Sequence, residues 1–88
     1  MKQNPNFLLR EVADSVVLVP VGEATRTFPG MITMNPTGKF LWELLAQEQT
    51  AETLTAAILE RYEVTEEVAA KDVATFLEKL TSAGAVIG

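Results

Sequence analysis

The chain of 88 residues contains neither cysteine nor histidine. The lack of cysteine excludes disulfides and thiolate metal sites, and the lack of histidine removes imidazole ligands and the most common general base. We therefore expect no metal site, no cofactor and no redox chemistry. No apolar run approaches the length that spans a bilayer, and residues 1–6 lack the apolar core of a signal peptide. The expected protein is cytoplasmic and has no membrane partner.

Basic residues are also few. Lysine and arginine number 7 against 12 aspartates and glutamates, which gives a formal net charge of −5. Such a charge repels phosphate and favours basic or neutral partners. Because the basic residues are scattered along the chain and form no stripe, we expect no nucleic-acid partner.

The length predicts one domain over residues 1–88, with a modest core and no large catalytic chamber. Hydrophobic residues make up 48% of the chain, which is too many for a disordered segment. Only residues 1–6 are expected to be flexible.

The first part of the chain has the composition of a β-sheet. Phe7 to Val12 and Ser15 to Val19 are rich in apolar and β-branched residues and are separated by a dipeptide that suits a tight turn. Pro20 should mark the end of the second strand or an unpaired position, because proline cannot donate to a ladder. The segment from Gly22 to Gly30 is expected to be a long loop whose role the sequence leaves open.

A third strand, Met31 to Met34, passes directly into a helix. Asn35 can accept a hydrogen bond from a free helical amide, and Pro36 suits the first helical position. Trp42 lies at the margin of the apolar helix face, where it either packs or meets a partner. That face consists of Phe40, Leu41, Leu44 and Leu45.

Two further helices follow, with Thr50 and Thr65 as their caps. Gly84 should end the last helix, and residues 85–87 are expected to form a tail or a short fourth strand. Strands precede helices, so the predicted class is α+β: a winged-helix-like domain with a three-stranded antiparallel sheet followed by three helices.

Catalytic features are sparse. The acidic residues of the third helix, such as Glu66, Glu67 and Asp72, suit solubility and the helix dipole, and no glycine-rich phosphate loop occurs. We expect no enzyme. A winged-helix DNA binder would have to dock this helix in a DNA groove, and the acidic residues of the helix oppose such docking.

Peptide binding is better supported, because an extended peptide can add to an exposed sheet edge through main-chain hydrogen bonds. We predict a groove between the third strand and the third helix. Ile32 and Met34 are expected to fill the core, which leaves Met31 and Thr33 freer, and a solvated flank is the alternative for the helix residues. The candidate binding residues are Met31, Ile32, Thr33 and Met34 on the strand and Val68, Asp72, Thr75, Phe76 and Lys79 on the helix.

A rival hypothesis starts from the second strand, which is apolar on both faces. Val16 and Leu18 point one way, and Val17 and Val19 point the other. An acidic winged-helix regulator or assembly subunit that forms a homodimer through this sheet would use the second face.

Several short motifs follow one another in a characteristic order and spacing: Met34-Asn35, residues 37–45, Thr50, Tyr62-Glu63-Val64, Asp72-Val73, Leu80 and Gly84. Together they resemble the pyrroloquinoline quinone synthesis protein D (PqqD)-like family over roughly residues 7 to 87. One departure is Ala46 to Gln49, where family members often have an Asp-Gly turn.

The resemblance implies a non-catalytic recognition element for ribosomally synthesised, post-translationally modified peptides. The leader segment of a precursor peptide would add as a strand beside the third strand, in a groove closed by the third helix. It would then be presented to a modifying enzyme, often a radical S-adenosylmethionine maturase.

Overall fold

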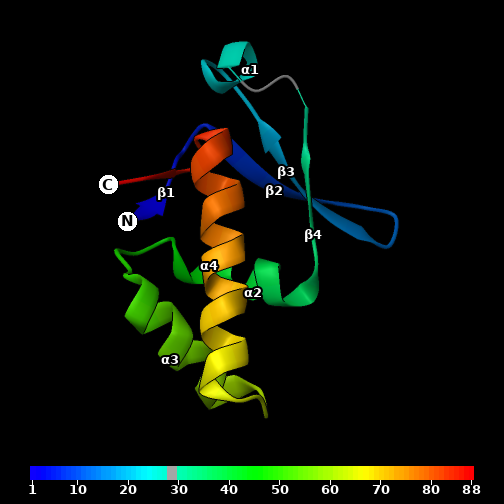
Figure 1. The fold of residues 1–88 in the computed structure, drawn as a ribbon. Coiled ribbons are helices and arrows are strands. Elements are labelled where there is room, and N and C mark those ends of the chain that lie inside the picture. Colours follow the sequence, from blue (N-terminus) through cyan, green and yellow to red (C-terminus); the bar gives the residue numbers. More distant parts are fainter. Residues whose placement is uncertain (28–29) are drawn as a thin grey trace.

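The computed structural model describes residues 1–27 and 30–88. β2, β3 and β4 form an antiparallel sheet in that order, and α2, α3 and α4 follow it in the chain, which confirms the α+β class (Figure 1). No helix in these described ranges has both the length and the apolar character needed to cross a membrane. The elements are β1 (Lys2–Gln3), β2 (Phe7–Val12), β3 (Ser15–Pro20), α1 (Ala24–Thr27), β4 (Ile32–Met34), α2 (Pro36–Leu44), α3 (Ala51–Arg61), α4 (Glu66–Ala83) and β5 (Val86–Ile87).

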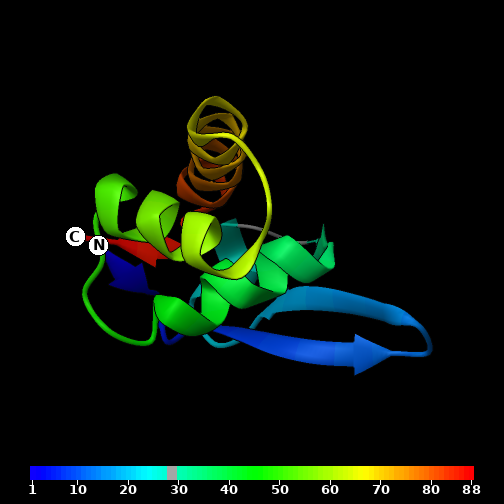
Figure 2. The same cartoon turned by 90° about the horizontal axis from the view of Figure 1, so that it is seen from below.

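The three-stranded sheet packs its inner face against the helices. Figure 2 shows α2, α3 and α4 on one side of the β2–β3 hairpin, with the other side uncovered. Leu18 of β3 and Ile32 and Met34 of β4 are buried on the helix side, and Val17, on the opposite face of β3, is buried as well. β3 ends at Pro20, as predicted.

The three longer helices begin where the sequence predicts, and the last one also ends there. The side chains of Asn35, Thr50 and Thr65 each accept a hydrogen bond from the amide three residues further on, at 2.7, 3.1 and 3.2 Å. Pro36 occupies the first turn of α2. Gly84 ends α4 with φ 79, in the left-handed region that glycine adopts without steric penalty.

The core lies between the sheet and the helices. Trp42 is only 3% exposed, so it packs in this core. Phe40 was expected on the buried face and is only half-buried, because its ring lies at the margin beneath the guanidinium of Arg61, 4.7 Å from the ring centre. The largest fully buried side chains are Leu18, Leu41, Leu45, Leu54, Ile58, Leu80 and Val73.

Residues 1–6, expected to be flexible, contain a strand. β1 pairs with β5, which makes a separate two-stranded sheet instead of extending the main one. The Gln3 amide donates to the Leu45 carbonyl at 2.8 Å, and the Asn4 amide donates to the Ala85 carbonyl at 2.8 Å. Of the two predictions for residues 85–87, the short strand is therefore the observed one. It pairs with the strand at the other end of the chain.

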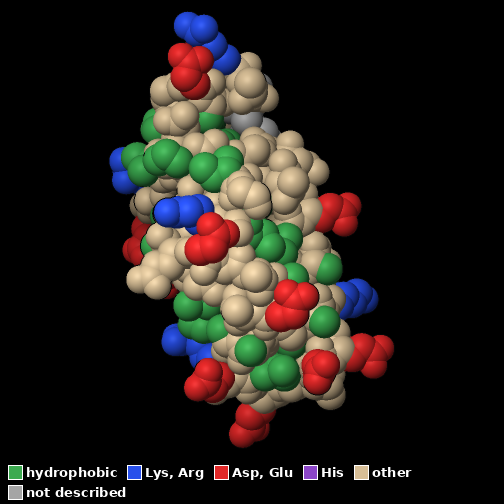
Figure 3. All heavy atoms as spheres, turned by 90° about the vertical axis from the view of Figure 1, so that its left-hand side faces the viewer, with side chains coloured by type: hydrophobic (Ala, Val, Ile, Leu, Met, Phe, Trp, Pro, Cys, Tyr) green, Lys and Arg blue, Asp and Glu red, His purple; other side chains and the backbone are tan. Residues whose placement is uncertain are grey.

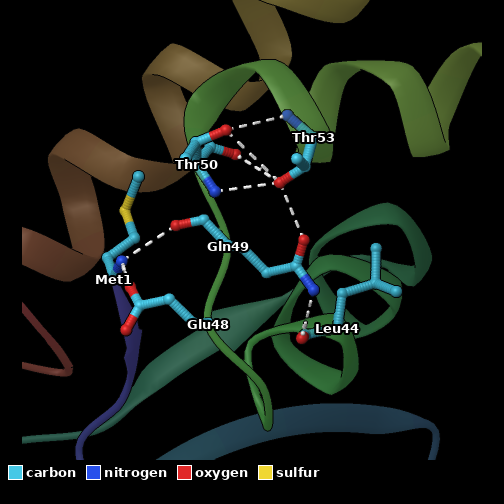
Figure 4. A network of polar contacts seen from close by, with 6 residues as sticks. All are labelled: Met1, Leu44, Glu48, Gln49, Thr50 and Thr53. Carbon is cyan, nitrogen blue, oxygen red and sulfur yellow. Dashed lines mark hydrogen bonds and ion pairs between the residues drawn. The ribbon is translucent and has the colours of Figure 1, made fainter.

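A polar network holds the connection between α2 and α3 (Figure 4). The Gln49 carboxamide donates to the Leu44 carbonyl at 3.0 Å and accepts from the Thr53 hydroxyl at 2.8 Å. The Met1 amino group donates to the Gln49 carbonyl at 2.8 Å and pairs with the Glu48 carboxylate. These bonds hold residues 46–49, the segment in which the chain departs from the Asp-Gly turn that the resemblance would imply.

The segment from Gly22 to Gly30 is not only loop, because it contains the single-turn helix α1. Ala24 is buried against the core, and Gly22 adopts φ 57 just before the helix. Residues 28 and 29 lie outside the described residues. The four-residue helix is too short to give a periodic apolar pattern, which explains why the sequence did not indicate it.

Candidate functional site

A groove runs between β4 and α4 and consists of two hollows. The main hollow has a volume of about 250 Å³. The side hollow has a larger volume, about 390 Å³, and is lined by Met31, Ile32, Thr33, Lys79, Ser82 and Ala83. The main hollow is lined by Ile32, Thr33, Met34, Asn35, Thr37, Gly38, Leu41, Lys71, Asp72, Thr75, Phe76, Lys79 and Leu80.

The hydrogen-bonding direction of β4 follows from the register of the whole sheet. The Val21 amide donates to the Asn6 carbonyl at 2.8 Å, one step beyond the last pair of the β2–β3 ladder. Since bonded and non-bonded pairs alternate along an antiparallel ladder, Val17 exchanges its bonds with Arg10 in β2. Thr33 lies opposite Val17 on the other side. The Thr33 amide and carbonyl therefore point away from β3, toward the open edge.

A second observation gives the same direction. The Lys79 ammonium on α4 donates to the Thr33 carbonyl at 3.2 Å, from the side opposite β3. Ile32 and Met34 then carry the ladder bonds to β3 opposite Leu18 and Val16. β4 is thus an edge strand whose main-chain groups at Thr33 face the groove and make no bond to β3.

The main hollow has an apolar floor and a charged rim. Met34, Leu41 and Leu80 are buried beneath it, whereas Lys71 and Asp72 are exposed above it. The sheet edge supplies main-chain groups and the floor supplies apolar contact, which together suit an extended peptide with an apolar side chain.

Gly38 brings the α2 backbone close to this floor. A Cβ atom at this position would lie 3.6 Å from the Met34 Cβ and 3.8 Å from the Phe76 Cδ1, both ordinary contact distances. It would lie only 3.2 Å from the Asn35 Oδ1 that caps the helix. Any side chain here would therefore fill space between the strand and α4.

The predicted site residues lie together, with two exceptions. Met31 is 64% exposed and lines the side hollow. Val68 is exposed and lines neither hollow, because it lies near the start of α4. The burial of Ile32 and Met34 and the exposure of Met31 and Thr33 agree with the predicted division of the strand. The main hollow brings together Ile32, Thr33, Met34, Asp72, Thr75, Phe76 and Lys79.

Sequence analysis missed the lining residues that belong to the start of α2, to the core and to the exposed part of α4. Asn35 was predicted to cap the helix and to anchor one end of the strand, but it was not named as a binding residue. Lys71 precedes Thr75 by four residues and so shares its helix face. The missed residues are Asn35, Thr37, Gly38, Leu41, Lys71 and Leu80 of the main hollow and Ser82 and Ala83 of the side hollow.

Elsewhere in the described residues, the charged groups form no comparable site. In the face drawn in Figure 3, acidic side chains gather at the end of the molecule where α4 begins, and basic ones are scattered. Exposed ion pairs join Lys39 to Glu11 at 3.1 Å and Arg26 to Glu23 at 4.0 Å. The described part of the chain has no cluster of three or more acidic, histidine or cysteine residues placed to hold a metal ion.

Comparisons with known proteins identify the family. No curated protein matches the chain. A solved structure described as "TbiB1 in Complex with the TbiA(beta) Leader Peptide" is similar over 100% of this chain and 96% of its own, with a TM-score of 0.77 and 23% identity. Another, described as "Lasso peptide synthetase B1 complexed with the leader peptide", is similar over 99% and 96%, with a TM-score of 0.74 and 17% identity. At such identities the likeness shows a shared fold. The family model described as "Coenzyme PQQ synthesis protein D (PqqD)" matches residues 15–86, so the chain belongs to the PqqD family.

Proposed function

We propose that this protein captures the leader segment of a ribosomally made precursor peptide and presents it to a modifying enzyme. The observation that carries the proposal is the open edge of β4, whose outward-facing amide and carbonyl at Thr33 lie toward a groove closed by α4. Family membership supports this function, as does the description of two similar structures as leader-peptide complexes.

The leader would bind as an added strand beside β4. The Thr33 amide would donate to the peptide, and the Thr33 carbonyl would accept from it. Alternate peptide side chains would then point toward α4 and enter the groove beside Phe76. Main-chain bonds would hold any extended segment, and the groove would select among side chains.

The proposed role is binding without catalysis. Within the described lining of the two hollows, Asp72 is the one carboxylate, and the chain has no histidine or cysteine. Such a lining suits recognition better than acid and base chemistry. The partner would supply the chemistry, and a radical S-adenosylmethionine maturase is the enzyme class that the family favours. The protein would bind the newly made precursor in the cytoplasm, which is the location that we propose for it.

Titration of the ¹⁵N-labelled protein tests the proposal. The probe is a synthetic leader segment of the precursor peptide encoded beside the gene. We expect the amide resonances of Thr33, Thr75 and Lys79 to shift, because these residues line the groove. Shifts confined to the other sheet edge, at Leu9 and Glu11 of β2, would contradict the assignment, as would an unchanged spectrum. A turnover screen on the isolated chain should show no activity.

The homodimer hypothesis has one observation in its favour. The uncovered face of the sheet carries exposed apolar side chains, with Val12 at 58% exposure and Leu8 at 37%. Sedimentation equilibrium over a wide concentration range tests it. A dimer that dissociates when Val12 is replaced by lysine would assign this face to self-association, and a monomer at every concentration would reject it.

A further inference from the structure

Lys79 spans the groove in the free protein. Its ammonium donates to the Thr33 carbonyl at 3.2 Å, and its side chain lines both hollows. This carbonyl is the acceptor that an added strand needs, so Lys79 occupies the position of a peptide amide. A peptide that extends along β4 must displace the ammonium from this acceptor.

The displaced ammonium has no acidic partner nearby on its own helix. Lys79 forms no ion pair within residues 1–27 and 30–88. Asp72 precedes it by seven residues, about 10 Å along the helix axis, and Glu78 points to a different side of the helix. A bound peptide would therefore leave the charge unpaired unless the peptide itself supplies a carboxylate.

The strand geometry fixes where that carboxylate must be. The peptide residue opposite Thr33 shares the side-chain direction of Thr33, away from the core, so the residues on either side of it point toward α4. One of these two faces the main hollow beside Met34, and the other faces the side hollow beside Ile32. Lys79 lines both hollows, but only the main one has the apolar floor formed by Leu41 and Leu80.

We propose that the preferred peptide carries an apolar residue and an acidic residue separated by one residue. The apolar side chain enters the main hollow, and the acidic side chain occupies the side hollow, where it pairs with the displaced Lys79 ammonium. This inference rests on the proposed function and specifies its substrate class.

Selection from a random library tests the spacing. Displayed 12-residue peptides are selected in parallel against the native protein, Lys79→Met and Lys2→Met. Methionine keeps the aliphatic stem and removes the charge, and Lys2 is the matched control because it is exposed and lines neither hollow. We expect the native protein and Lys2→Met to enrich the apolar residue together with the acidic residue two positions away. Lys79→Met should enrich the apolar residue alone.

The best selected peptide is then compared with its analogue in which glutamine replaces the acidic residue. The native protein should bind the acidic form about twofold to fivefold more tightly, as expected for an exposed ion pair. Lys79→Met should bind both forms equally, and the glutamine form at least as tightly as the native protein does, because no ammonium competes for Thr33. Circular dichroism checks that both variants are folded.

The outcomes separate this inference from the proposed function. Acidic preference that persists in Lys79→Met, or enrichment without an acidic residue, overturns the inference and leaves peptide binding intact. If the native protein enriches no peptide family, peptide capture itself is rejected and the inference fails with it.

Discussion

Replacing Thr33 with proline removes the outward-facing main-chain donor of β4. Because Ile32 and Met34 carry the ladder bonds to β3, the substitution should leave these bonds intact. Proline is tolerated on edge strands when the missing donor would face solvent. We expect the free energy of unfolding to fall by at most about 1 kcal/mol, which lowers Tm by roughly 4–8 °C in a domain of this size.

Peptide affinity should fall even though the fold survives. One main-chain hydrogen bond contributes about 0.5–1.5 kcal/mol net, which is about twofold to twelvefold in Kd. The proline ring also takes the space of the peptide carbonyl, so the measured loss should equal or exceed this range. Fluorescence anisotropy with a labelled leader peptide measures the change. Thr33→Val is the matched control, because it keeps the amide and the shape of the side chain.

Two results would refute this reasoning. A loss of more than about 3 kcal/mol in unfolding free energy would show that the Thr33 amide is bonded inside the sheet. In that case Thr33 would carry the ladder bonds to β3, and the outward-facing main-chain groups would be those of Ile32 and Met34. Native affinity in a folded Thr33→Pro protein would exclude strand addition at β4.

Three further substitutions test the fold. Asn35→Ala removes the α2 cap, whose bond to Gly38 is 2.7 Å, and should lower unfolding free energy by about 1 kcal/mol, whereas Asn35→Asp should restore most of it. Gly84→Ala should lower Tm through the backbone strain of a non-glycine residue at φ 79, worth about 1–2 kcal/mol. An added Cβ would meet nothing within 4 Å, so no clash contributes, and equal stability would contradict the prediction. Leu54→Ala, at a fully buried position, should lower unfolding free energy in urea by about 2–5 kcal/mol. Leu59→Ala, on the same helix but 37% exposed, should lower it far less.

The features that sequence predicted are those fixed by neighbouring residues. Asn35, Thr50 and Thr65 cap helices through bonds to amides three residues away, so their effect is visible in a short stretch of sequence. The alternation of Ile32 and Met34 with Thr33 predicted which side chains fill the core. These local patterns, taken in order, were enough to define the α+β class and both walls of the groove.

The features that sequence missed depend on distant partners. β1 and β5 have two residues each and lie at opposite ends of the chain, so neither shows a periodic pattern. Lys79 and Thr33 are 46 positions apart, and no local pattern pairs a helical lysine with one particular carbonyl. The sequence does not indicate that the absence of a side chain at Gly38 leaves space near Phe76.

The shortness of β4 bears on how long a captured peptide would stay. The strand has three residues, and Thr33 alone among them faces outward, offering one donor and one acceptor. These two bonds contribute roughly 1–3 kcal/mol together, less than the 4 kcal/mol of a millimolar complex. Residence time therefore depends on side chains in the groove, since affinity differences appear mainly in the dissociation rate. If the partner enzyme drew these side chains out of the groove, the peptide would dissociate rapidly.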